Sequence, residues 1–339
     1  MYSQDVEILS LHWLSLVTTQ EYSVLQSSLS TDRGTDLNNE IIDYIKNIVS
    51  EDNVHIDEPM SRHTTFRTGG PASLFISPGS QKEVLKVTDI VRKLGVDFFV
   101  IGNGSNLLVS DKGFDGVVIS LEKLGDIRLE GETQILAEAG ALNSAIASFA
   151  RDNALTGFEF AAGIPGTIGG AMIMNAGAYD GEMKLIAKEV KVISPDGTIM
   201  TLDNDTMEFG YRTSAIKGRG FTVLSALLSL SKGSEKDISE KMKDLALRRK
   251  EKQPLEYPSA GSTFKRPQGY FAGKLIEEAG LRGFSVGGAE VSEKHCGFVI
   301  NKADATSEDI YRLIQEVKER VYANSGVMLE PEVVMVGEF

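Results

Sequence analysis

The stretch on which the fold interpretation depends most runs from 162 to 179 and reads AGIPGTIGGAMIMNAGAY. Its glycines follow one another so closely that we expect neither a regular helix nor a strand interior, because glycine weakens both. Backbone this poor in side chains lies close against a neighbour, and its N–H groups suit an extended, phosphate-bearing cofactor. A close-packed junction between two domains is the alternative interpretation.

A second glycine segment, GNGSNL at 102–107, also lets backbone N–H groups approach a pyrophosphate. It is not a GxGxxG motif, because Leu107 occupies the position of the last glycine and strand-like residues follow it. A Rossmann-type site is therefore disfavoured. The alternative is an ordinary tight turn between two strands.

Apolar spacing around these segments predicts a mixture of helices and strands. Helices are expected over 41–49, 81–94, 143–152 and 236–252, and a last one begins at the capping signal Thr306–Asp309 and ends at Gly326. Strands are expected over 72–77, 97–101, 107–109, 117–121, 134–138, 189–194, 198–202, 221–230 and 333–336, the last of them buried. The pattern predicts an α+β fold.

Composition restricts the function. The 35 Lys and Arg against 48 Asp and Glu leave a net charge of −13, which argues against nucleic-acid binding and favours a small-molecule task. A length of 339 residues predicts two or three domains. No apolar run approaches the ~18 residues of a membrane span, and no Lys or Arg precedes Arg33 as a signal peptide would require, so we expect a cytoplasmic protein.

Three polar residues stand out as candidates for chemistry. Arg212 carries a guanidinium fork suited to a carboxylate or phosphate, although a solvated surface charge is the alternative. Ser262 lies near Lys265, which would ease loss of its proton, although a simple loop is the alternative. Glu332 precedes an apolar strand, where burial would raise its pKa and leave a neutral hydrogen-bond donor, although a solvated strand end is the alternative.

Cysteine and histidine carry little signal. The single cysteine, Cys296, excludes a disulfide framework and a multi-thiolate metal site. Its neighbour His295 does not by itself form the line of nucleophile and base that cysteine catalysis needs. The other histidines, His12, His55 and His63, lack the spacing of metal ligands, so no metal is expected.

Taken together, the chain resembles the UDP-N-acetylenolpyruvoylglucosamine reductases, the flavoenzymes of bacterial peptidoglycan synthesis. The resemblance runs from about Pro59 to Glu338. It rests on TGG at 68–70, GNGSNLL at 102–108, GIPGTIGGA at 163–171, MNAGAY at 174–179, GYR at 210–212, AGSTFKRP at 260–267 and EPEVVMVG at 330–337.

The resemblance implies an FAD-binding domain of the vanillyl-alcohol-oxidase type in two subdomains, 37–122 and 123–235, followed by an α+β substrate-binding domain, 236–339. Residues 1–36 lie outside it as a weakly structured extension. The short connection from Arg212 to Leu224 leaves no room for the Tyr-bearing insertion of some members, so the chain resembles the shorter form. A monomer is favoured, with roles in cell wall biogenesis, cell shape and cell division.

The resemblance also implies the site. NADPH would reduce FAD, and the enolpyruvyl group of UDP-N-acetylglucosamine-enolpyruvate would be reduced to give UDP-N-acetylmuramate. The expected catalytic residues are Arg212, Ser262 and Glu332. The expected contacts of the FAD pyrophosphate are Gly102, Asn103, Gly104, Ser105, Asn106, Gly163, Ile164, Pro165, Gly166, Thr167, Ile168, Gly169 and Gly170. The expected contacts of the UDP-sugar substrate are Tyr211, Lys265, Arg266, Lys274 and His295.

Two competing functions remain from the sequence. One is an FAD-dependent oxidase of alcohols or hydroxy acids on the same cofactor domain. Such oxidases often tether FAD through His or Cys, and neither glycine segment contains one. The other is a catalytically silent nucleotide-binding or wall-sensing module.

Overall fold

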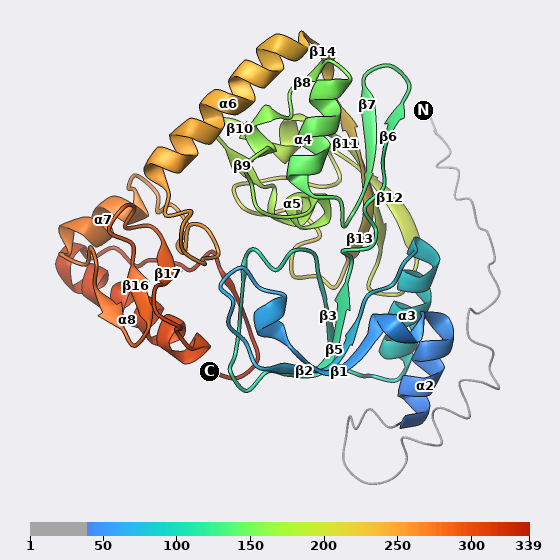
Figure 1. The fold of residues 1–339 in the computed structure, drawn as a ribbon, viewed down its shortest axis with the longest axis horizontal. Coiled ribbons are helices and arrows are strands. Elements are labelled where there is room, and N and C mark those ends of the chain that lie inside the picture. Colours follow the sequence, from blue (N-terminus) through green and yellow to red (C-terminus); the bar gives the residue numbers. More distant parts are fainter. Residues whose placement is uncertain (1–38) are drawn as a thin grey trace, which may run out of the picture.

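The computed structural model describes residues 39–339, arranged as three lobes (Figure 1). The extension predicted for 1–36 lies outside the described residues. Short 3₁₀ helices connect several elements, at Glu51–Asn53, Met60–Arg62, Glu159–Ala161 and Met183–Leu185.

The first lobe is a four-stranded sheet in the order β1-β2-β5-β3 with two helices against it (Figure 1). Its elements are α2 (Asn39–Ile48), β1 (Val54–Pro59), β2 (Pro71–Ile76), α3 (Gln81–Lys93), β3 (Phe98–Ile101) and β5 (Phe114–Ser120). Strands β2 and β3 both pair parallel with β5, and α3 lies between them in the chain. Helix α3 is capped by Ser80, whose hydroxyl accepts from Glu83 N, and it buries Val84, Val87 and Val91.

The second lobe is an antiparallel five-stranded sheet in the order β12-β11-β13-β7-β6. Its elements are β6 (Ile127–Glu130), β7 (Gln134–Glu138), α4 (Asn143–Asp152), β8 (Leu155–Thr156), α5 (Ile168–Met174), β9 (Gly177–Ala178), β10 (Gly181–Glu182), β11 (Ala187–Ile193), β12 (Ile199–Asp203), β13 (Thr222–Ser229) and β14 (Ser231–Lys232). The predicted strand 134–138 and helix 143–152 are confirmed to the residue.

Helix α5 shows that the expectation of no helix in the glycine-rich stretch was wrong. A Cβ at Gly169 would lie 3.0 Å from both Cβ and O of Ala139, so the absent side chain allows the helix to lie directly on the backbone beside β7. The first helical donors find partners there, because Ile168 N donates to Ala141 O and Gly169 N to Ala139 O, each at 2.9 Å. Tertiary packing thus outweighs the low helix propensity of glycine.

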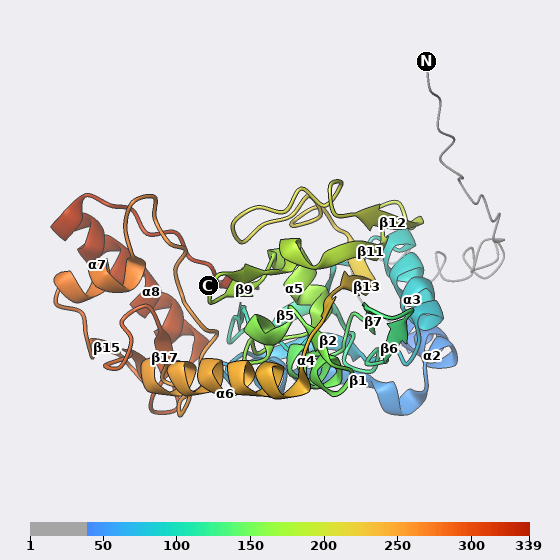
Figure 2. The ribbon, with the colours of Figure 1, turned by 90° about the horizontal axis from the view of Figure 1, so that it is seen from above.

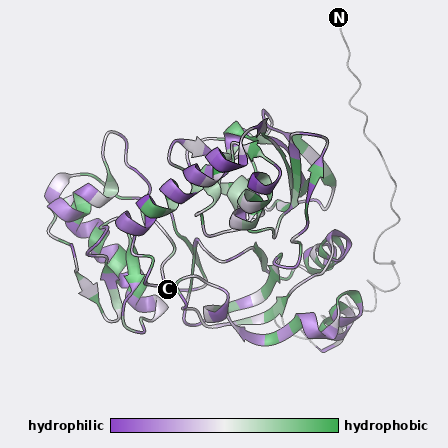
Figure 3. Ribbon diagram, turned by 45° about the horizontal axis from the view of Figure 1, so that its top comes forward, coloured by the Kyte–Doolittle hydropathy of each residue, from purple (hydrophilic) through white to green (hydrophobic). Residues whose placement is uncertain are grey.

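The third lobe is connected to the others by α6 (Glu235–Lys252), a long, mostly hydrophilic helix (Figures 2 and 3). It contains α7 (Ala272–Glu278), β15 (Ser285–Val286), β16 (Ala289–Val291), β17 (Val299–Asn301) and α8 (Ser307–Ser325). Helix α8 starts in a Thr306/Asp309 capping box and ends at a left-handed Gly326, as predicted. Its apolar face packs into the core of this lobe, burying Ile310, Leu313, Ile314, Val317 and Val321.

The chain then returns to the first lobe. Strand β18 (Val334–Val336) pairs parallel with β4 (Leu107–Val109), which directly follows the first glycine segment. The prediction that residues 333–336 are buried holds only in part, since Val333 is buried whereas Val334 is 42% exposed. The reason is that β18 belongs to a two-stranded ribbon and borders the central cavity, so only part of its surface meets the core. Between residues 39 and 339, no helix has the length and apolar character needed to cross a membrane.

Candidate active site

A cavity of about 1540 Å³ lies where the three lobes meet. Both glycine segments line it, and so do Arg212, Ser262, His295 and Glu332. The cavity therefore brings together residues that are separated by more than 200 positions in the sequence.

The first glycine segment forms the turn between β3 and β4, and all of Gly102–Asn106 lines the cavity. Gly104 has φ +57°, and a Cβ there would lie 1.9 Å from His63 O, so glycine is required for both conformation and space. The two glycine segments touch each other, because a Cβ at Gly102 would meet the Thr167 hydroxyl. The segment is a tight turn between two strands, as the alternative interpretation held, but it also lines the cavity.

The second glycine segment contributes the neighbouring part of the cavity wall. Residues 163–167 and Gly170 line the cavity, whereas Ile168 and Gly169 are buried on the other side of α5. A Cβ at Gly170 would have nothing within 4 Å, so this face of α5 is open toward the cavity. Of the predicted pyrophosphate contacts, only Ile168 and Gly169 do not line the cavity.

Unsatisfied polar atoms in the cavity wall fit a coenzyme rich in donors and acceptors. The Asn143 side chain is buried, lines the cavity close to Gly166, and neither its Nδ2 nor its Oδ1 has a hydrogen-bond partner. The Thr65 hydroxyl is a second buried cavity group without a partner. Buried polar groups normally have partners, so a ligand that supplies them is expected here. The residues present thus fit FAD, with Asn143 as an additional contact.

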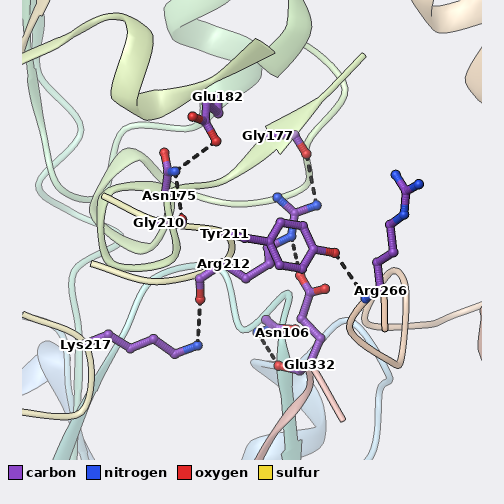
Figure 4. Close-up of polar contacts among 10 residues, drawn as sticks. All are labelled: Asn106, Asn175, Gly177, Glu182, Gly210, Tyr211, Arg212, Lys217, Arg266 and Glu332. Carbon is purple, nitrogen blue, oxygen red and sulfur yellow. Dashed lines mark hydrogen bonds and ion pairs between the residues drawn. The ribbon is translucent and has the colours of Figure 1, made fainter. Parts of the chain in front are cut away.

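Arg212 lies in a sharp turn closed by a bridge between Gly210 and Thr213. Its guanidinium Nη2 donates to Gly177 O at 3.0 Å, and its Nε lies 2.8 Å from Oε1 of Glu332 (Figure 4). The two side chains form an ion pair, yet the buried Nε–H makes no aligned hydrogen bond to any protein group. Arg212 and Glu332 are therefore in direct contact at the cavity wall.

Two hydrogen bonds to its backbone hold Glu332 in place. Its N–H donates to Thr263 O at 2.8 Å, and its carbonyl accepts from Asn106 Nδ2 at 3.1 Å. Burial raises the pKa of the Glu332 carboxyl, against the opposing effects of the Arg212, Lys217 and Lys265 cations. The direction agrees with the neutral acid that the sequence suggested.

Ser262 lies close to Glu332 in the cavity wall because the adjacent residue, Thr263, is hydrogen-bonded to Glu332. It immediately precedes Thr263, whose carbonyl binds Glu332 N and whose N–H donates to Gly297 O at 2.8 Å. Ser262 is exposed and lines the cavity. The three predicted catalytic residues thus border one space, although their roles stay predictions.

The predicted substrate contacts are more dispersed. His295 lines the cavity, and Tyr211 is next to Arg212 with its hydroxyl accepting from Arg266 N at 3.2 Å. Lys265 pairs with Glu330 and, like Tyr211 and Arg266, does not line the cavity. Lys274 lies on α7, 3.6 Å from Glu278, and does not line the cavity.

Four cations in the cavity wall, Arg62, Arg67, Arg249 and Lys252, were not identified from the sequence. Arg249 and Lys252 come from the last turns of α6, where a basic helix end looks like a solvated surface. Arg249 is packed against Gly163, and burial lowers its pKa while nearby Tyr179 opposes that effect. No local motif marks Arg249 or Lys252, because only the position of α6 brings them to the cavity. The described residues contain no cluster of His, Cys, Asp and Glu that could hold a metal ion.

Comparison with known proteins agrees with this geometry. Residues 72–203 match a family described as an FAD binding domain, and residues 253–336 match the C-terminal domain of UDP-N-acetylenolpyruvoylglucosamine reductase. The predicted α+β class and FAD cofactor are confirmed.

Similar proteins carry the same name along most of their length. The UDP-N-acetylenolpyruvoylglucosamine reductase of Caldanaerobacter subterraneus subsp. tengcongensis is 51% identical over 88% of this chain and 98% of its own length. That of Clostridioides difficile is 50% identical over 89% and 99%. The solved structure of UDP-N-acetylenolpyruvylglucosamine reductase from Thermus caldophilus has a TM-score of 0.74 at 33% identity, covering 84% of this chain and 99% of that one.

Proposed function

Because the chain belongs to the UDP-N-acetylenolpyruvoylglucosamine reductase family and is an FAD-dependent oxidoreductase, we propose that it reduces UDP-N-acetylglucosamine-enolpyruvate to UDP-N-acetylmuramate, with NADPH as hydride donor. The structural observation that carries this proposal is the Arg212–Glu332 pair at the wall of the cavity. The reaction belongs to peptidoglycan synthesis. We place it in the cytoplasm, in support of cell shape and division.

The substrate is an enol ether conjugated to a carboxylate. FAD, when bound, supplies the hydride for this double bond after taking one from NADPH. Addition at the terminal methylene carbon pushes the electron pair of the double bond toward the carboxylate. The protein must then stabilise a growing negative charge and deliver one proton to the adjacent carbon.

Arg212 and neutral Glu332 are placed to hold that carboxylate. The guanidinium of Arg212, which lines the cavity, supplies one donor, and the raised pKa of Glu332 favours the protonated acid that supplies another. Both hydrogen bonds strengthen as charge develops, and preorganised donors of this kind contribute about 2.7–4 kcal/mol each in other enzymes.

Ser262 is the proposed proton donor. Its hydroxyl borders the same cavity, and it is fixed beside Glu332 through the hydrogen bond between Thr263 O and Glu332 N. Transfer of its proton to the carbon next to the carboxylate completes the addition of hydride and proton across the double bond. General acid catalysis typically contributes about 10²–10⁴-fold.

Arg249 and Lys252 are the residues proposed to bind the diphosphate of UDP. Both line the cavity, and they form a local positive site in a protein whose net charge is −13. This assignment does not need the Tyr-bearing insertion that the shorter form lacks.

A visible spectrum tests the proposed function. The purified protein should be yellow and should bleach when NADPH is added without oxygen. Colour should return on addition of the enolpyruvyl nucleotide under the same anaerobic conditions. Recovery with oxygen but not with the nucleotide would instead support the oxidase, and a colourless protein that takes up no FAD would leave the silent module.

A further inference from the structure

Arg212 has a backbone conformation that its residue type disfavours. Its φ of +54° lies in the left-handed region, where the Cβ of a non-glycine residue is crowded. Such conformations cost free energy and persist where surrounding contacts over-determine them. The contacts that hold this turn therefore decide where the guanidinium points.

Two side chains bind the backbone carbonyls on either side of the turn (Figure 4). Nδ2 of Asn175 donates to Gly210 O at 2.9 Å, and Nζ of Lys217 donates to Arg212 O at 2.9 Å. Gly210 and Arg212 flank Tyr211, so these two hydrogen bonds hold both ends of the short segment that carries the guanidinium.

Asn175 is itself rigid. It is buried, has φ +43° at the C-terminal end of α5, and its side chain also donates to Glu182 Oε2 at 3.0 Å and accepts from Lys184 N at 2.9 Å. The same MNAGAY segment supplies Gly177, whose carbonyl accepts from Nη2 of Arg212. This segment therefore holds both the turn and the guanidinium that projects from it.

We propose that Asn175 and Lys217 are positioning residues that lock the left-handed turn at Arg212 and so direct its guanidinium to Glu332 and the cavity. The inference rests on the proposed function in assigning a catalytic purpose to the Arg212–Glu332 contact. The geometry of the turn, however, can be measured whether or not the proposed function is correct. Neither side chain needs to touch the substrate.

Lys217 could also act on Glu332 directly through its charge, and the test must distinguish this effect from positioning of Arg212. Its ammonium lies in the field of Glu332, and the Lys217 pKa is lowered by burial and by neighbouring Lys265 while Glu332 and Glu330 raise it. A direct electrostatic effect of Lys217 on Glu332 would survive removal of the Arg212 guanidinium, whereas a positioning effect would not.

The first experiment compares the two half-reactions in Asn175→Ala and Lys217→Met. Because displacement of a reacting group by about 1 Å can cost on the order of 10²-fold, we expect reoxidation by the enolpyruvyl nucleotide to slow by about 10²-fold. Reduction of the bound FAD by NADPH should stay at the wild-type rate. Equal slowing of both half-reactions would overturn the proposal.

Ser214→Ala is the matched control. Its hydroxyl donates to Ile173 O at 2.8 Å and so joins the same two segments, but it binds neither Gly210 nor Arg212. If general loosening of the loop were the cause, Ser214→Ala would slow reoxidation as much as the two positioning variants. We expect it to retain nearly the wild-type rate.

A double-mutant cycle then identifies the route of action. In an Arg212→Ala background, adding Lys217→Met or Asn175→Ala should change the residual reoxidation rate by less than about twofold, because the group being positioned is gone. A further large loss would show that the residue acts on the substrate or Glu332 directly, and would overturn the positioning role.

Crystal structures of the holoenzyme variants give a readout that is independent of turnover. In Lys217→Met, we expect φ of Arg212 to leave the left-handed region and the distance from Nε to Glu332 Oε1 to lengthen from 2.8 Å. An unchanged turn would refute the inference even if the nucleotide reaction is confirmed.

If the wild type fails to reduce the nucleotide, the proposed function fails while this measurement of the turn still decides the inference. If Asn175→Ala does not fold, Lys217→Met carries the whole test.

Discussion

At the scale of single residues, the Glu332 carboxyl experiences two opposed influences. Burial raises its pKa, whereas Arg212, 2.8 Å away, favours the ionised form. Burial is the larger effect, so the proton stays bound to higher pH than in the unfolded chain. The folded state therefore gains stability from this group at low pH and loses that contribution as pH rises through the raised pKa.

Glu332 variants test the neutral acid. We expect wild-type reoxidation by the nucleotide to slow as pH rises through the raised pKa of Glu332, because the ionised carboxylate can no longer donate. Glu332→Gln should lose this pH dependence and keep more activity than Glu332→Ala, whose loss should reach about 10²–10³-fold. Rapid-mixing absorbance across a pH series measures both effects. Equal losses in the two variants would contradict the donor role.

Ser262→Ala tests the proton donor. We expect FAD reduction by NADPH to continue unchanged while reoxidation by the nucleotide slows by about 10²–10⁴-fold, because no group replaces the hydroxyl as acid. The measurement is the absorbance of each half-reaction after rapid mixing. Parallel slowing of both would show that the substitution disturbs the cavity as a whole.

The sequence could predict these residues only where a motif marked them. Arg212, Ser262 and Glu332 stand in recognisable segments, and all three border the cavity. Asn143 lies in α4 and Arg249 in the mostly hydrophilic α6, and neither position carries a local signal. Their place in the cavity wall follows from how α4 and α6 pack, which no local pattern records.

At the scale of elements, the N-terminus of α8 is capped from two lobes. Thr306 supplies the local cap, because its hydroxyl accepts from Asp309 N at 3.0 Å. Asp111 of the first lobe accepts from Ser307 N and Glu308 N, each at 2.9 Å. Donors that a helix would otherwise leave free thus bind a carboxylate that also complements the helix dipole.

Asp111→Ala should therefore weaken the contact between the first and third lobes. We expect the free energy of unfolding to fall by about 0.5–2 kcal/mol, the usual worth of a cap. Amide hydrogen exchange at Ser307 and Glu308 should become faster. Asp115→Ala is the matched control, since this exposed residue accepts only from Ser73 Oγ among the described hydrogen bonds. Equal effects of the two substitutions would contradict the interlobe cap.

Helices were predicted correctly where the apolar spacing of their own residues marked them. The prediction failed where contacts with other parts of the chain determine the structure. The amphipathic patterns of α3, α4 and α8 were sufficient, whereas α5 was missed because its stability comes from the backbone of residues 139 and 141. The burial of β18 was overestimated because an apolar strand that borders a ligand cavity has the same composition as a core strand. Sequence periodicity cannot distinguish those two surroundings.

At the scale of the whole molecule, FAD should bind the lobes together, because residues of all three line one cavity. At a free FAD concentration 100 times its dissociation constant, we expect about 2.7 kcal/mol of added stability in the wild type, measured as a higher melting temperature. Gly170→Leu should remove this increase and leave the protein colourless, because its side chain would project from the open face of α5 into the cavity.

Gly125→Leu is the control for that substitution. Gly125 is exposed, does not line the cavity, and has similarly open surroundings. It should bind FAD and gain stability as the wild type does. A yellow Gly170→Leu protein with normal FAD-dependent melting would remove the second glycine segment from the cofactor site.

The return of β18 to β4 also has a consequence for biosynthesis. Ser110 N donates to Val336 O at 2.8 Å and Ser110 Oγ to Glu338 O, so the wall of the cavity is closed by residues that the ribosome adds more than 200 positions after the first glycine turn. A nascent polypeptide that has reached residue 300 has both glycine turns but not Glu332. It would be unable to process substrate, so turnover must await synthesis of Glu332 and of β18.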